Sequence, residues 1–108
     1  MMRSDALGAA LARIAPRLPP FETGAVIDRA LTSPGLRTAQ VETAAWLALV
    51  AYARHVCTEY DDLLAEGYDR DSARHFVRDD LNAALALWGS AKRVPDEEAG
   101  DEEGTPLP

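Results

Sequence analysis

Hydrophobic residues recur along this chain at spacings of three and four, which is the period of an α-helix. The first such stretch carries its apolar residues at Leu7, Leu11, Ile14 and Leu18. Ser4 is a favourable N-cap residue, so we expect a first helix that begins after it. A second helix is expected after Pro19, since a proline at the first helical position lacks only an amide that would be unpaired anyway.

A long third helix is predicted over about residues 38–65, and a fourth over about residues 70–88. Gly67 follows the third predicted helix, at the position where helices commonly end with a left-handed backbone conformation. Asp69 or Asp71 is expected to be the N-cap residue of the fourth helix. Only a few residues separate the two helices, so they are expected to form an antiparallel hairpin. The apolar stripe of the third helix comprises Ala45, Trp46, Leu49, Ala53, Val56, Tyr60, Leu63 and Leu64. That of the fourth comprises Ala73, Val77, Leu81, Ala84 and Trp88, widened by Phe76 and Leu85.

These elements predict an all-α, four-helix domain over residues 1–94, in which the long hairpin packs on the two shorter N-terminal helices. Hydrophobic residues make up 47% of the chain but aromatic ones only 6%, so small and aliphatic helix formers must build the core. A chain of 108 residues is long enough for one such core and too short for two. Residues 95–108 are acidic, rich in Pro and Gly and without periodicity, and are expected to form a disordered tail.

The net charge of −7 is concentrated in that tail, which holds six acidic residues and no basic one. Residues 1–94 hold 11 basic and 12 acidic groups, so the predicted domain is nearly neutral. Ten of the 11 cations are arginines, whose planar guanidinium favours fixed pairs with carboxylates or phosphates. The charge distribution therefore leaves an anion-binding role open for the folded part.

Other features of the chain indicate a cytoplasmic protein. The single cysteine cannot form an internal disulfide, which favours a reducing compartment. Arg13 interrupts the apolar N-terminal stretch, so no signal peptide is expected. The longest uncharged apolar run covers residues 43–53, well short of the roughly 20 residues that span a bilayer, so no membrane partner is expected.

The stretch "ARHVCTEYDD", residues 53–62, gathers many of the chemically reactive side chains. Projection onto a helix separates it into three faces. One line carries Arg54, Thr58 and Asp61, and a second carries His55, Glu59 and Asp62. The apolar stripe takes Val56 and Tyr60, with Cys57 at its border. The stretch is therefore not one catalytic constellation.

Three arginines of the fourth helix are spaced by four along one line: Arg70, Arg74 and Arg78. The projection places Arg70 and Arg74 close to the apolar face, where an unpaired cation would be costly. Asp61 on the facing helix is the expected partner. We predict an Asp61–Arg74 ion pair that holds the hairpin together, with Arg54 and Tyr60 able to join it.

Catalytic and metal-binding interpretations fit the spacing less well. A metal site would need His55 and Asp62, with His75 reaching across from the fourth helix. His55 and Cys57 are two residues apart and point in different directions on a helix, which argues against a nucleophile pair. An enzyme that uses His55 with Asp61 or Asp62 is therefore only a third hypothesis. No catalytic residue, metal or cofactor is assigned.

The arginine line also fits the spacing needed to follow phosphates. Acids of the same helix would repel a nucleic-acid backbone at every turn: Asp69, Asp71, Asp79 and Asp80. Nucleic acid is therefore not the expected partner. Binding of a small anionic ligand or a nucleic-acid phosphate through the arginines is the second hypothesis.

Residues 49–89 also resemble a known family. Their pattern is similar to the motifs R-H-x-x-T-x-Y-D, L-L-x-x-G and D-x-x-x-A-R, followed by a tryptophan, of domain of unknown function 2293. The matching positions here are Arg54, His55, Thr58, Tyr60 and Asp61; Leu63, Leu64 and Gly67; Asp69, Ala73 and Arg74; and Trp88. The upstream "LTSPGLRTA" and "AAWLALVAY" are similar to bacterial members. The resemblance implies a small cytosolic helical domain and brings no assigned activity.

The first hypothesis for function is a noncatalytic protein-interaction or structural module. Its partner would be an unknown protein or, through leftover apolar surface, a second copy of the chain. The polar cluster that would stabilise the hairpin or hold a ligand comprises Arg54, His55, Thr58, Tyr60, Asp61, Arg70, Arg74 and Arg78.

Overall fold

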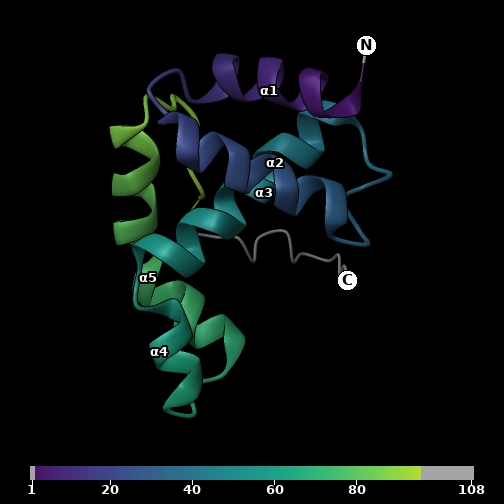
Figure 1. Cartoon of the computed structure of the whole chain (residues 1–108). Coiled ribbons are helices and arrows are strands. Elements are labelled where there is room, and N and C mark those ends of the chain that lie inside the picture. Colours follow the sequence, from purple (N-terminus) through teal and green to yellow (C-terminus); the bar gives the residue numbers. More distant parts are fainter. Residues whose placement is uncertain (1, 96–108) are drawn as a thin grey trace.

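The computed structural model describes residues 2–95, which fold into helices joined by short connections (Figure 1). Five helices occur in this part of the chain: α1 (Arg3–Ile14), α2 (Pro20–Thr32), α3 (Val41–Cys57), α4 (Tyr60–Ala65) and α5 (Arg70–Leu87). No strand is present among these residues. The predicted all-α class is confirmed, whereas the predicted set of four helices is wrong, because the third predicted helix is divided into α3 and α4.

The predicted disordered tail, apart from Pro95, lies outside the described residues, so it and the domain boundary at residue 94 stay predictions. None of the helices within residues 2–95 combines the length and the apolar character that crossing a bilayer requires.

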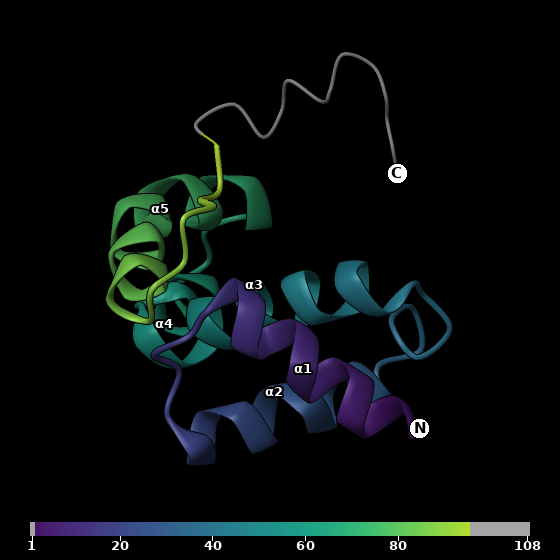
Figure 2. The ribbon, with the colours of Figure 1, turned by 90° about the horizontal axis from the view of Figure 1, so that it is seen from above.

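Helix α3 is the centre of the fold and contacts α1, α2 and α5 (Figures 1 and 2). Four residues of its first half are fully buried: Ala44, Ala45, Ala48 and Leu49. The small alanine side chains let α1 and α2 approach closely, and Leu7, Leu11 and Val26 fill the space between the helices. Burial of a leucine or valine side chain contributes about 1.5–3 kcal/mol relative to its exposure, so this cluster holds the body of the molecule together.

Proline, glycine and aspartate mark helix ends as the sequence predicts. Helix α2 has Pro20 at its first position. Gly67 follows α4 with a φ angle of 104°, a left-handed conformation that glycine adopts without steric cost. Asp69 caps α5, because its carboxylate accepts a hydrogen bond from the Ser72 backbone N–H at 2.8 Å. Three of the predicted boundary signals are therefore confirmed.

The start of α1 differs from the prediction. Its N-cap is Met2 rather than Ser4, and no side chain caps the helix. Arg3 instead reaches the loop before α3, where its Nη2 donates hydrogen bonds to the carbonyl oxygens of Leu36 and Ala39, at 3.0 and 2.6 Å. This contact fastens α1 to a loop more than thirty residues away, and periodicity gives no sign of it.

The C-terminal end of α5 is fastened to the turn between α1 and α2. The Arg17 backbone N–H donates a hydrogen bond to the Trp88 carbonyl oxygen at 2.8 Å, and the Trp88 ring centre lies 6.3 Å from that of Tyr52 on α3. Gly89 is required at this contact for two reasons. Its φ of 91° disfavours other residues, and a Cβ atom there would lie 3.1 Å from Cγ of Pro16.

The predicted helix of residues 38–65 is broken at Thr58, whose backbone is extended between α3 and α4 (φ −134°, ψ 176°). The Thr58 hydroxyl donates a hydrogen bond to the Arg54 carbonyl oxygen and accepts one from the Tyr60 backbone N–H at 3.1 Å. One side chain thus satisfies a carbonyl at the end of α3 and an amide at the start of α4. The chain can bend here without leaving these backbone groups unpaired.

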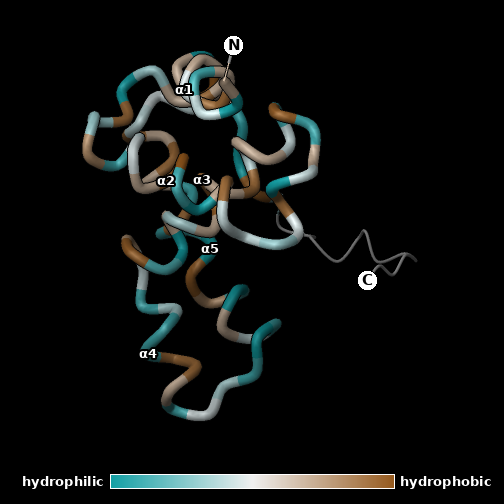
Figure 3. The backbone as a smooth tube through the Cα atoms, turned by 45° about the vertical axis from the view of Figure 1, so that its right-hand side comes forward, coloured by the Kyte–Doolittle hydropathy of each residue, from teal (hydrophilic) through white to brown (hydrophobic). Residues whose placement is uncertain are grey.

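Because of the break, α4 packs against the first half of α5 (Figure 1). These two helical segments form one end of the described part of the molecule, which projects from the body formed by α1, α2 and α3. A second core cluster lies there, separate from the one around α3: Tyr60, Ala73 and Val77, with Leu63 packed beside them. Helix α5 therefore pairs with α4 at this end and with α3 beyond it, in place of the single long partner that was predicted. Figure 3 shows hydrophilic positions spread along this end, with hydrophobic ones between them.

Three residues predicted to lie on the apolar stripes are exposed: Val56, Leu64 and Phe76. Val56, just before the break, is 59% exposed, and Phe76 on α5 is 58% exposed. Phe76 faces outward and meets the Tyr68 ring edge-on, with ring centres 5.5 Å apart. The projection that placed these residues on apolar stripes assumed two straight helices side by side, and the bend removes that geometry.

Candidate functional site

Tyr60 is the residue around which the polar cluster is organised. It begins α4, is only 4% exposed, and packs with Ala73 and Val77 of α5. The guanidinium carbon of Arg54 lies 5.7 Å from the centre of its ring, within the range of a cation–π interaction. The His55 ring meets the same ring edge-on, with centres 5.3 Å apart. Tyr60 therefore joins the end of α3 to α5.

His55 is the hydrogen-bond partner of Asp61. Its Nδ1 lies 2.6 Å from Oδ1 of Asp61, and the pair bridges α3 and α4 across the break. The predicted Asp61–Arg74 ion pair is wrong, since no such pair occurs within residues 2–95. The bend at Thr58 rotates α4 relative to α3, so Asp61 leaves the line of Arg54 and meets His55. Both side chains of the pair are well exposed, at 36% and 59%, so the pair alone adds little stability.

Three half-buried arginines belong to the two helices that Tyr60 joins, and we call them the arginine surface: Arg54 on α3, and Arg74 and Arg78 on α5. The Nε atom of each is shielded from solvent. Arg74 and Arg78 flank Val77, which packs on Tyr60. Four residues along a helix correspond to about 6 Å, so these two arginines present their charges at consecutive turns of α5. Their stems are packed while the residues still reach the surface.

Arg70 does not share this environment, because it is exposed at the first position of α5. Its predicted place near the apolar face is therefore wrong. Within the arginine surface, Nη1 of Arg78 donates towards Nδ1 of His75 at 3.4 Å, and Nε of Arg74 has no hydrogen-bond partner among the described residues. Of the predicted cluster, the structure gathers at the α3–α4 junction Arg54, His55, Thr58, Tyr60 and Asp61.

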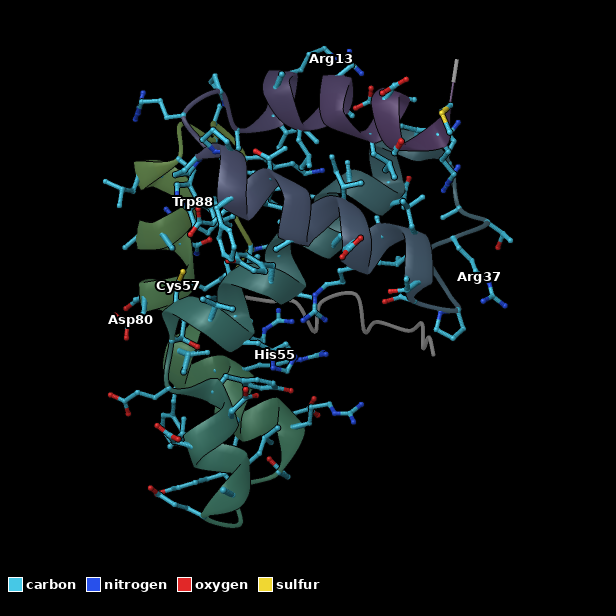
Figure 4. The ribbon with its side chains drawn as sticks, in the orientation of Figure 1. Arg13, Arg37, His55, Cys57, Asp80 and Trp88 are labelled. Carbon is cyan, nitrogen blue, oxygen red and sulfur yellow. The ribbon has the colours of Figure 1, made fainter. Side chains whose placement is uncertain are left out.

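Cys57 is separate from this cluster. Figure 4 shows it on a different side of α3 from His55, as the two-residue spacing predicts. Although the cysteine reaches solvent, partial burial and then the Glu22 carboxylate raise the pKa of its thiol, so less of it is present as the reactive thiolate. This geometry and chemistry argue against a Cys57–His55 nucleophile pair.

Metal ligands do not gather in the region that the structure describes: residues 2–95 contain no group of three or more His, Cys, Asp or Glu side chains placed to hold a metal ion. His75, considered as a ligand together with His55 and Asp62, instead contacts the Phe76 ring and Arg78.

The side chain of Asn82 holds the segment that follows α5, a contact absent from the sequence-based prediction. Asn82 is buried, its Nδ2 donates to the Val94 carbonyl oxygen at 3.0 Å, and its Oδ1 accepts from the Val94 N–H at 2.8 Å. Residues 90–93 line one hollow with four residues of α5: Asp79, Asn82, Ala83 and Ala86. Asn82 lies one turn beyond Arg78, so this segment ends one helical turn from the arginine surface. The only signal in the sequence was an amide residue next to the apolar stripe of a helix.

Comparison with protein-family models matches residues 10–89 to the family described as "Uncharacterized conserved protein (DUF2293)". The matched range includes all three residues of the arginine surface and confirms the resemblance drawn from residues 49–89. Comparisons with curated proteins and with solved structures gave no match.

Proposed function

This chain belongs to the DUF2293 family, whose description names no activity, and we propose that it is a noncatalytic protein-interaction module. In this proposal the binding site is the arginine surface, and the ligand is a short acidic segment of a partner protein. The observation that carries the proposal is the packing of the three arginines, whose Nε atoms are shielded although the residues still reach solvent.

Packed stems matter because a free arginine side chain has about 2 kcal/mol of rotamer entropy to lose when it binds a ligand. Part of that loss has already occurred here, since burial of Nε restricts the side chain before any partner arrives. The guanidinium groups are thereby pre-organised for carboxylates, which they bind through two parallel hydrogen bonds. Arg74 and Arg78, at consecutive turns, suit carboxylates spaced a few ångströms apart.

A protein segment fits this surface better than a nucleic acid does. Asp71, Asp79 and Asp80 are exposed on the same helix as Arg74 and Arg78. A phosphate backbone that followed α5 would meet these carboxylates, and the repulsion would offset the gain at the arginines. A short acidic segment can cover the arginine surface alone and place uncharged residues elsewhere.

The proposal is tested with a fluorescently labelled peptide that carries a short run of Glu and Asp flanked by uncharged residues, and its binding is followed by fluorescence anisotropy. Arg74→Gln and Arg78→Gln are expected to weaken binding roughly fivefold each, the loss of one ion pair at the protein surface, which contributes up to about 1 kcal/mol. Arg37→Gln is the matched control, because Arg37 is exposed on a loop far from α4 and α5 (Figure 4). Thermal unfolding of each variant checks that the fold is retained.

The outcome that contradicts the proposal is a lower melting temperature of Arg74→Gln with peptide binding intact, because Arg74 would then be a purely structural residue. Equal binding by Arg37→Gln and Arg78→Gln would also contradict it. If single-stranded DNA binds more tightly than the peptide and loses affinity in the same variants, the arginines serve phosphate instead, and the protein-partner proposal is wrong.

A further inference from the structure

The segment that follows α5 is held in a defined direction. The chain reverses at Gly89 and runs back beside α5 towards its N-terminal end, as Figure 2 shows. Lys92 lies over the Trp46 ring of α3 at 4.7 Å, and both backbone polar groups of Val94 are hydrogen-bonded to Asn82. Val94 is itself buried in the main core. The structure therefore fixes where the chain leaves the domain and which way it is heading.

That direction leads along the arginine surface. Asn82, Arg78 and Arg74 succeed one another at intervals of four on α5, so Asn82 and Arg74 are about 12 Å apart along the helix axis. An extended chain covers about 3.3 Å per residue, so roughly four residues beyond Val94 suffice for the same distance. The residues in question read Pro95, Asp96, Glu97 and Glu98, and three of the four are acidic.

We infer that Asp96, Glu97 and Glu98 occupy the arginine surface of their own chain and compete there with the acidic partner. The inference rests on the proposed function, since it assigns the regulation of the same surface. Exposed ion pairs are individually weak, but a tether that begins at Val94 supplies the acids at an effective concentration in the millimolar range. A partner would then bind only if its affinity for the arginine surface is high enough to displace Asp96, Glu97 and Glu98.

The acids of residues 101–103 provide an internal control, because they carry the same charge further from the anchor. In the full-length chain, one variant replaces Asp96→Asn, Glu97→Gln and Glu98→Gln, and the matched variant replaces Asp101→Asn, Glu102→Gln and Glu103→Gln. NMR spectra of the arginine Nε–Hε groups report occupancy without any partner. We expect the signals of Arg74 and Arg78 to move in the first variant only, and affinity for the labelled acidic peptide to rise roughly tenfold in that variant only.

Three outcomes separate this inference from the proposed function. Arginine signals that are the same in wild type and both variants overturn the inference, even if the peptide binds. Signals that move equally in both variants show a general charge effect and overturn it as well. In the third outcome, the arginine signals move only in the first variant, but the protein binds no acidic peptide even when its own acids are neutralised. That result supports the inference and shows the proposed function to be wrong.

Discussion

The break between α3 and α4 depends on the hydroxyl of Thr58, and Thr58→Val tests that dependence. Valine keeps the shape and the β-branch of threonine but removes the bonds to the Arg54 carbonyl and the Tyr60 amide. Each such hydrogen bond contributes about 1 kcal/mol net, and water can replace part of the loss because the residue is only half-buried. We expect the free energy of unfolding to fall by about 1–2 kcal/mol.

A loss of that size corresponds to a decrease in melting temperature of roughly 5–10 °C for a domain of this length. It is measured by thermal and urea unfolding, followed by far-UV circular dichroism. Thr58→Ser keeps the hydroxyl and should lie closer to wild type than Thr58→Val. Thr38→Val is the matched control, since Thr38 is exposed in the turn before α3 and should tolerate the change.

The result that would refute this reasoning is a Thr58→Val protein within about 0.5 kcal/mol of wild type, the range of ordinary surface substitutions. A Thr58→Ser protein less stable than Thr58→Val would point the same way. In either case the methyl group and the packing of Tyr60, rather than the two hydrogen bonds, would hold the bend.

Further predictions concern the ends of α5 and the single thiol. Asn82→Ala leaves both backbone polar groups of buried Val94 unpaired and should lower the free energy of unfolding by about 2–3 kcal/mol in urea titrations. Glu22→Gln should speed alkylation of Cys57 by iodoacetamide at neutral pH, because burial and then Glu22 raise the pKa of the thiol; an unchanged rate would exclude that electrostatic contribution. The hydrogen bonds accepted by Asp69 lower its pKa, so its contribution to stability is present above its unfolded value of about 3.9 and is lost as the pH falls through the lower folded value. Asp69→Asn, which cannot titrate, should therefore lose less of its free energy of unfolding as the pH falls below about 4. An acid dependence of the free energy of unfolding identical to that of wild type would contradict this.

The residues of the candidate site were foreseeable from the sequence, but their pairing was not. Arg54, His55, Tyr60 and Asp61 stood out by residue type, and the structure brings all four to one junction. Their assignment to faces assumed an unbroken helix, which sent Asp61 towards Arg74. A change of backbone direction at one residue is enough to exchange that partner for His55, because it rotates every side chain beyond it.

The sequence by itself determined the helical class, part of the buried face of α3 (Ala45, Leu49 and Ala53) and several helix ends, because these follow from propensity, periodicity and the backbone limits of proline and glycine. Tertiary structure decided three further features: the bend at Thr58, the exposure of Val56 and Phe76, and the hydrogen bonds between the Asn82 side chain and the Val94 backbone. Local energetics favour continuation of the helix through Thr58, since Val56 and Tyr60 keep its period. Besides the two hydrogen bonds of Thr58, the bend is stabilised by the burial of Tyr60 against Ala73 and Val77, residues more than ten positions away, and no local pattern contains that contact.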